Sequence, residues 1–132
     1  MAGSKGSKYF DIFLNYNFWL TGKDGSEILG KDFLLLLENI GKEGSIQAAA
    51  KKNKISYRKA WGDIKKTEES LKFALIETKR GGKDGGKSFL TKDAENMLEA
   101  FKELEAEFDK VVHDTARTFF HKLNKDKKND TV

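Results

Sequence analysis

GSIQAAAKKNKISYRKAWGDIKKT, residues 44–67, predicts two short helices joined by a tight polar turn. Ser45 and Ser56 each stand where a hydroxyl can cap a helix N-terminus, and apolar residues follow both of them. Asn53 and Lys54 interrupt the apolar pattern between the two helices. The second helix is expected to carry its cations away from a buried stripe made of Tyr57, Ala60, Trp61 and Ile64. This arrangement is typical of a helix-turn-helix.

Positive charge is concentrated in and just after this stretch. Between Lys51 and Lys92 there are thirteen Lys and Arg against five Asp and Glu, a local excess of +8, whereas the whole chain carries +4. Charge segregated in this way is the electrostatic footprint that phosphate binding requires. The alternative is an ordinary helix pair with a solvated lysine face.

Composition limits the class of protein. The chain has 132 residues, 38% hydrophobic and 35% charged, which indicates one globular domain with a modest core. It has no cysteine, and this excludes disulfides and thiolate metal sites. The longest apolar run, Phe33 to Leu37, is far too short for a membrane span, and the N-terminus lacks the apolar region of a signal peptide. A cytoplasmic location is therefore expected, with no membrane partner.

A hairpin and a helix are predicted before residue 44. Residues 1–8 are small and polar and are expected to be disordered. Apolar residues alternate from Tyr9 to Leu20, which predicts a strand, and residues 27–29 are expected to return as its partner. Lys31 to Ile40 is expected to form a helix that ends with Gly41 in the left-handed conformation.

A basic hairpin is predicted after the helix-turn-helix. Residues 73–78 and 88–90 have strand composition and flank a loop rich in glycine and lysine. A hairpin in this position is a wing, whose cations can reach phosphates or a minor groove. The wing cations are Lys79, Arg80, Lys83 and Lys87.

The last predicted element is a long helix capped by Thr91. Apolar residues and two threonines recur at alternating steps of three and four from Ala94 to Thr118, over nearly four heptads. One small core does not need so long a stripe, which favours a dimerisation helix over packing within one subunit. The residues expected at the dimer interface are Met97, Phe101, Leu104, Phe108, Val111 and Val112.

No catalytic residues, metal site or cofactor are expected. GGKDGGKS, residues 81–88, matches the phosphate-loop pattern, but Lys87 and Ser88 lead into a strand instead of opening a helix, so the match is interpreted as accidental. His113 and His121 are eight residues apart and too distant to share a metal ion. The chain is therefore predicted not to be an enzyme.

Several of these segments together resemble the N-terminal DNA-binding domain of the ModE family of molybdate-responsive transcriptional regulators. The likeness extends over about residues 9–110 and rests on Gly44–Ile46, Ala49–Lys51, Ile55–Trp61, Gly81–Gly86 and Leu90–Thr91. It implies a winged-helix fold, related to that of LysR-type regulators, and operator binding by a symmetric dimer. The match to the family motif implies a recognition helix that begins with Ser56, Tyr57, Arg58 and Lys59, and a wing that includes Lys83 and Lys87.

The chain also departs from that family. Full-length ModE regulators carry C-terminal oxyanion-binding domains, and the sequence up to Val132 has no β-rich segment to supply one, so molybdate binding is not expected from this chain alone. Gly62 is expected in the middle of the second helix, where it costs about 1 kcal/mol relative to Ala. Such a glycine lets DNA backbone or a neighbouring helix come close.

The sequence thus predicts a mainly α fold with small β hairpins, a winged helix-turn-helix with a long C-terminal dimerisation helix. The expected organisation is a disordered N-terminus at 1–8, the winged helix-turn-helix domain with its N-terminal hairpin at 9–90, the dimerisation helix at 91–123 and a disordered tail at 124–132.

The predicted function is sequence-specific transcriptional regulation by a homodimer that binds an inverted-repeat operator in double-stranded DNA. Two alternatives stay open: a non-specific nucleic-acid-binding or architectural protein, and a protein-interaction adaptor. The residues expected to contact DNA are Ser45, Ser56, Tyr57, Arg58, Lys59, Lys65, Lys66, Lys79, Arg80, Lys83 and Lys87.

Overall fold

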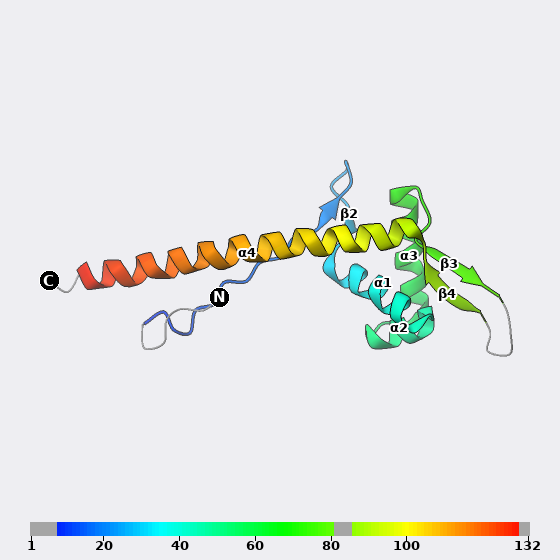
Figure 1. Ribbon diagram of the computed structural model, residues 1–132, viewed down its shortest axis with the longest axis horizontal. Coiled ribbons are helices and arrows are strands. Elements are labelled where there is room, and N and C mark those ends of the chain that lie inside the picture. Colours follow the sequence, from blue (N-terminus) through cyan, green and yellow to red (C-terminus); the bar gives the residue numbers. More distant parts are fainter. Residues whose placement is uncertain (1–7, 81–85, 130–132) are drawn as a thin grey trace. The chain divides into compact units, whose positions relative to one another are not determined.

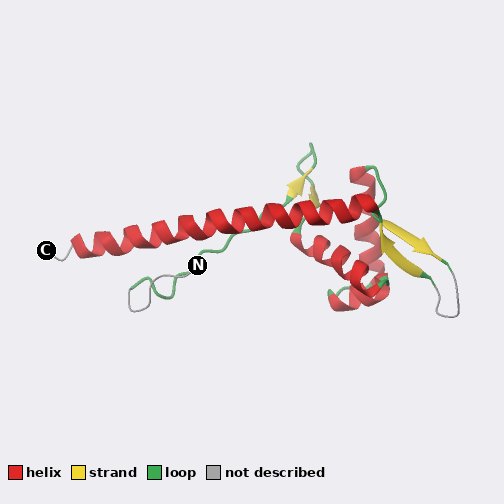
Figure 2. Cartoon of the chain, viewed as in Figure 1, coloured by secondary structure: helices red, strands yellow, loops and turns green. Residues whose placement is uncertain are grey.

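The computed structural model describes residues 8–80 and 86–129 (Figure 1). Helices predominate among these residues, and the elements follow in the order β1, β2, α1, α2, α3, β3, β4, α4. Each of the two described sheets is a single antiparallel hairpin (Figure 2). The prediction of a mainly α fold with small hairpins and a long last helix is confirmed. Residues 18–101 form one compact unit, and residues 8–17 belong with residues 102–129 in a second.

The N-terminal hairpin is much shorter than the apolar alternation predicted. β1 is Leu20–Thr21 and pairs antiparallel with β2, Glu27–Leu29, with Leu20 opposite Leu29. Residues 9–19 form turns and irregular chain apart from a bridge residue at Phe13, so the expected strand from Tyr9 is wrong. The physical reason is that β2 is only three residues long. A strand needs a partner strand for its backbone hydrogen bonds, and an alternating pattern of apolar residues does not supply one.

α1, Lys31–Glu43, contributes four buried side chains to the core: Leu34, Leu36, Leu37 and Ile40. It runs past the predicted end at Ile40, and its left-handed C-cap is Gly44 with φ 67°, not Gly41. The Gly44 N–H donates to the Ile40 carbonyl at 2.9 Å. Gly41 instead lies inside the helix, where a Cβ would come within 3.1 Å of the Leu90 side chain. The two glycines therefore serve different purposes: a turn at Gly44 and close packing at Gly41.

The helix-turn-helix is formed by α2, Ile46–Lys52, and α3, Tyr57–Leu71, as predicted. The buried residues of α3 are Ala60, Ile64 and Thr67. Tyr57 was expected in this stripe but is 50% exposed, and Trp61 is only partly buried. The two rings pack edge to face, 6.2 Å apart. Thr67 occupies the inner position instead, because it lies seven residues after Ala60 and hence on the same face.

The wing is confirmed as a two-stranded hairpin made of β3, Ile76–Lys79, and β4, Lys87–Leu90. Its register places Ile76 opposite Leu90 and Lys79 opposite Lys87. One backbone hydrogen bond holds the wing to the end of α1, because the Ser88 N–H donates to the Gly44 carbonyl at 3.0 Å. A second closes the base of the hairpin, because the Thr91 N–H donates to the Leu75 carbonyl at 2.9 Å.

α4, Lys92–Asn129, is 38 residues long. Its predicted cap is confirmed, since the Ala94 N–H donates to Thr91 Oγ1 at 3.1 Å. Within the first compact unit, Phe101 is 6% exposed and stacks on Phe18 with ring centroids 5.1 Å apart. The helix extends beyond residue 123, where it was expected to end. Residues 124–129 contain neither glycine nor proline, and so nothing in them interrupts a helix.

In the second compact unit, the N-terminal segment is joined to α4 by a hydrogen bond from the Tyr16 hydroxyl to the Asp109 carboxylate. This hydrogen bond is the largest of several effects that raise the pKa of Tyr16 to about 12. Ala116 and Phe120 are buried in this part of α4, whereas Thr115, Thr118 and Phe119 of the predicted stripe are exposed. The apolar stripe thus shifts by one residue towards the end of the helix.

Glu68 connects α3 to the wing. Its Oε2 accepts the N–H groups of Leu75, at 2.7 Å, and Ile76, at 3.3 Å, at the start of β3. Its other oxygen pairs with Lys65 at 3.4 Å, and the side chain is only 14% exposed. A charged acceptor shared by two backbone donors holds the end of α3 against the first residues of the wing.

We expect Glu68→Ala to lower the free energy of unfolding by about 1.5–3 kcal/mol, because two backbone donors lose a charged acceptor. Urea unfolding followed by circular dichroism measures the change. Glu69→Ala is the matched control, since Glu69 is exposed and pairs with no described residue. Equal effects of the two substitutions would show that Glu68 contributes only its charge and not its contacts.

Candidate nucleic-acid interface

The outer face of α3 is the candidate interface. An α-helix turns by about 100° per residue, so positions two residues from the buried Ala60 and Ile64 point away from the core. Arg58, Gly62 and Lys65 follow one another at steps of four and three along this outer face. All three are exposed. The buried stripe therefore fixes which cations the helix presents to a partner.

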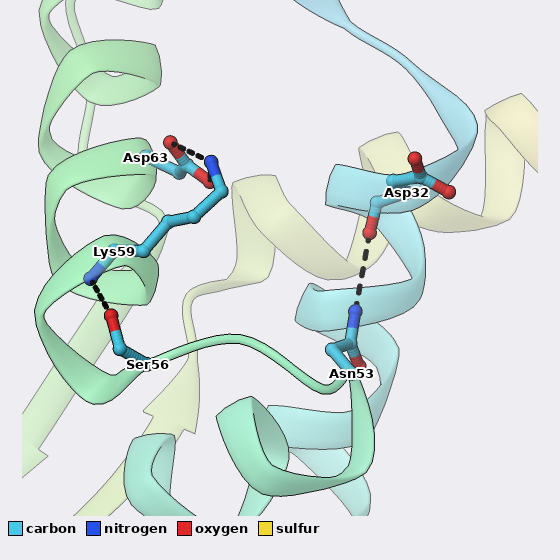
Figure 3. A network of polar contacts seen from close by, with 5 residues as sticks. All are labelled: Asp32, Asn53, Ser56, Lys59 and Asp63. Carbon is cyan, nitrogen blue, oxygen red and sulfur yellow. Dashed lines mark hydrogen bonds and ion pairs between the residues drawn. The ribbon is translucent and has the colours of Figure 1, made fainter.

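Serine caps set where each helix of the pair begins. Ser56 Oγ accepts the Lys59 N–H at 3.0 Å (Figure 3). Ser45 Oγ accepts the Ala48 N–H at 3.1 Å. Both serines were predicted to contact DNA, and in the structure both hydroxyls are engaged as acceptors at helix N-termini. Each O–H group keeps its own proton to donate.

The turn between the two helices is a Schellman motif, in which two backbone N–H groups close the helix end. The Ile55 N–H donates to the Ala50 carbonyl at 3.0 Å, and the Lys54 N–H to the Lys51 carbonyl at 3.1 Å. Lys54 adopts the left-handed conformation with φ 58°. A lysine at this position accepts backbone strain that a glycine would avoid, and it adds a cation to the turn.

Asn53 ties this turn to α1. Its Oδ1 accepts from Asn39 Nδ2 at 2.6 Å, and its own Nδ2 donates to the Asp32 carbonyl oxygen at 3.4 Å. Figure 3 shows the second of these contacts, with Asn53 below Asp32 of α1. The side-chain amide thus fixes the turn from two sides. The start of α3, three residues later, is positioned by the same contacts.

The predicted cations of α3 fall into two classes. Lys59 pairs with Asp63 at 3.0 Å (Figure 3), and Lys65 pairs with Glu68 at 3.4 Å. The Lys65 ammonium also lies 5.3 Å from the centre of the Trp61 ring. The Lys59–Asp63 pair is exposed and contributes at most about 1 kcal/mol, so a phosphate can replace this carboxylate at small cost. Glu68 is only 14% exposed and also accepts two backbone N–H groups.

Arg58 and Lys66 form the second class, because they are exposed and pair with no other described residue. Sequence reasoning grouped Arg58 with Lys59, for base edges or flanking phosphates, and Lys65 with Lys66, for the DNA backbone, and did not separate paired from unpaired cations. The signal that separates them was present, since Asp63 lies four residues after Lys59, and Glu68 lies three after Lys65.

The wing presents a second group of cations. Lys79 and Lys87 face each other across the hairpin, and Arg80 is exposed beside them. Lys79 Nζ lies 5.5 Å from the centre of the Phe89 ring, which is 41% exposed. Sequence reasoning did not single out Phe89, although it lies only two residues after Lys87. Lys83, also predicted here, lies outside the described residues.

The residues predicted at the dimer interface are placed differently from one another. Phe101 is buried within its own chain, and Met97 is partly buried against the same core. Leu104, Phe108 and Val111 are 37%, 42% and 58% exposed and lie on one face of α4 at steps of four and three. Val112 is partly buried. An apolar surface on α4 therefore begins after Phe101.

The described residues hold neither a candidate metal site nor a membrane-spanning helix. Within residues 8–80 and 86–129, no three His, Asp or Glu side chains are grouped so that they could hold a metal ion. Both histidines, His113 and His121, are exposed on α4. None of the helices in the described part of the chain is both long and apolar enough to span a bilayer.

Comparison with curated proteins finds relatives of part of this chain. The chain is 37% identical over 78 residues to the transcriptional regulator ModE of Haemophilus influenzae, covering 59% of this chain and 31% of ModE. It is 35% identical over 78 residues to the molybdenum-pterin-binding protein MopB of Rhodobacter capsulatus, covering 59% of this chain and 29% of MopB.

A third relative is the DNA-binding transcriptional dual regulator ModE of Escherichia coli K12, 35% identical over 66 residues, half of this chain and a quarter of that protein. The chain spans less than a third of the length of each of these relatives. A search against protein-family models gives no match.

Solved structures give a partial likeness. The BenM DNA-binding domain, in a complex with benA site 1 DNA, is 25% identical with a TM-score of 0.49, over 64% of this chain and 90% of that chain. The CbnR DNA-binding domain, in a DNA complex, is 22% identical with a TM-score of 0.47, over 65% and 92%. The fold described above stands on this chain's own elements.

We expect Ser56→Ala to destabilise the protein by about 1 kcal/mol, because the first turn of α3 loses the acceptor for its Lys59 amide. Thermal and urea unfolding measure the change. Ser70→Ala serves as the control, since Ser70 is exposed near the other end of α3 and caps nothing. An unchanged stability for Ser56→Ala would show that the helix start is fixed by packing alone.

Proposed function

We propose that this protein is a sequence-specific DNA-binding transcriptional regulator of the ModE type, and that α3 is its recognition helix. The observation that carries the proposal is the outer face of α3. This face holds exposed cations with no carboxylate partner among the described residues, on a helix fixed by its cap and its buried stripe. Relatives named as transcriptional regulators match 59% and 50% of the chain.

The size of α3 suits the major groove of B-form DNA. A helix with side chains is about 10–12 Å across, and the groove is about 12 Å wide. Arg58, in the first turn and without an ion pair, is placed to reach base edges, where a guanidinium can bind guanine O6 and N7 together. The N-terminal amides of α3 and the Ser56 hydroxyl would face phosphate.

The remaining cations would supply contacts to the DNA backbone. Lys66 is available without breaking an ion pair, whereas Lys59 and Lys65 exchange a carboxylate for phosphate. Lys54 in the turn adds a further charge. Lys79, Arg80, Lys83 and Lys87 of the wing would contact phosphates beside the major groove or enter the adjacent minor groove. Phosphate contacts of this kind fix position on the duplex, and base contacts provide specificity.

We further propose that the protein acts as a homodimer paired through α4. The exposed apolar face at Leu104, Phe108 and Val111 is a surface that a second copy can cover. Two-fold pairing would place two recognition helices in successive major grooves about 34–36 Å apart, on an inverted repeat. The protein would act in the cytoplasm and would not be an enzyme. Molybdate binding is not proposed for this chain.

We expect Arg58→Ala to weaken binding to operator duplexes by about 1–3 kcal/mol, with a much smaller effect on random DNA, because a base contact is lost. The operator is first obtained by selecting bound duplexes from a random pool with the wild-type protein, and affinities are then measured at two salt concentrations. Lys23→Ala is the charge control, in the turn between β1 and β2.

Three results contradict parts of this picture. Equal losses on operator and random DNA would assign Arg58 to phosphate. A steep salt dependence with no selected sequence would favour a non-specific nucleic-acid-binding protein. Absence of binding to any duplex at low salt, with the dimer retained, would favour a protein-interaction adaptor.

We expect Val111→Glu to shift the protein from dimer to monomer, because it places a charge in the proposed apolar interface. Sedimentation equilibrium measures the dimer dissociation constant. Ala106→Glu is the matched control, since Ala106 is exposed on the opposite side of α4 from Leu104 and Val111. A dimer unaffected by Val111→Glu would rule out this face of α4 as the interface.

A further inference from the structure

No contact with another described residue explains the glycine at position 62. It lies in the middle of α3, and its backbone is not left-handed. A Cβ built on it would meet nothing within 4 Å. Gly41 and Gly44 differ from it, because a Cβ at Gly41 would meet Leu90 at 3.1 Å and Gly44 has φ 67°. Glycine is the weakest helix former after proline, so its presence at position 62 needs another reason.

The face of α3 on which Gly62 lies supplies that reason. It lies two residues from Ala60 and two from Ile64, both fully enclosed, and therefore faces away from the core. Its neighbours at spacings of three and four residues are Arg58, Lys59, Lys65 and Lys66, all of them exposed. The bare backbone at Gly62 is thus surrounded by four cations on the surface proposed to meet DNA.

The surroundings indicate which partner comes close. A neighbouring protein helix packed on a glycine would require apolar residues beside it to bury. The positions one turn before and after Gly62 carry positive charge instead, which suits a polyanion. A helix already nearly as wide as the major groove goes deeper where a side chain is missing.

We infer that Gly62 is the point of closest approach between α3 and the base-pair edges, and that it determines sequence specificity. This inference rests on the proposed function. The missing side chain lets the backbone of α3 lie against the floor of the groove, while Arg58 and Lys65 reach to either side. A larger residue at position 62 would hold the helix away from the bases and leave its phosphate contacts largely in place.

The test uses Gly62→Ala and Gly62→Leu in the full chain. Gly62→Ala is expected to raise the unfolding temperature by roughly 4–8 °C, because alanine is the better helix former and nothing in the chain blocks it. Both variants are expected to bind the selected operator more weakly, about tenfold for Ala and more for Leu, with binding to random DNA unchanged. For Gly62→Ala, stability is thus expected to rise while affinity for the operator falls. A variant that failed to fold would lose both.

Ser70→Ala is the control for helix stabilisation away from the outer face, and it should leave operator affinity unchanged. Wild-type affinity for the operator in both Gly62 variants would overturn the inference and leave the proposed function standing. Equal losses on operator and random DNA would also overturn it, because Gly62 would then affect phosphate contacts only. A wild-type protein that selects no sequence would overturn the proposed function itself, and the inference with it.

Discussion

Burial of one narrow stripe on α3 is the constraint on which the proposed interface depends. Ala60 and Ile64 are completely enclosed, in the same core as Leu37 and Ile40 of α1. Because the residues of a helix turn by a fixed angle, enclosing these positions sets the direction of every other side chain on α3. The outer face needs no contacts of its own to be oriented. It can therefore be specialised for a partner without loss of packing.

The wing depends on the same core through a few polar contacts. Glu68, at the end of α3, accepts two N–H groups at the start of β3, and the Gly44 carbonyl accepts the Ser88 N–H of β4. Hydrogen bonds thus hold both strands of the wing to the helices. Charged and backbone hydrogen bonds are directional, so they fix the angle of the hairpin more closely than apolar contact would.

Ion pairs within α3 also distinguish its cations from one another. Lys59 and Lys65 have carboxylate partners one turn away, whereas Arg58 and Lys66 do not have one among the described residues. The cations of one basic patch therefore differ in whether they already have a carboxylate partner. In the proposed complex Arg58 would contact base edges, whereas Lys66 and the two paired lysines would contact phosphate.

The sequence by itself determined the features that depend on neighbours along the chain: the caps at Ser45, Ser56 and Thr91, the two helices with their turn, and the wing hairpin. A cap or a turn is satisfied within three or four residues, so local sequence is enough. Tertiary structure decided what depends on distant partners. The apolar segment from Tyr9 has only the three-residue β2 as a possible partner strand. Gly41 lies within α1, where a Cβ would come within 3.1 Å of the Leu90 side chain, and the left-handed turn falls at Gly44.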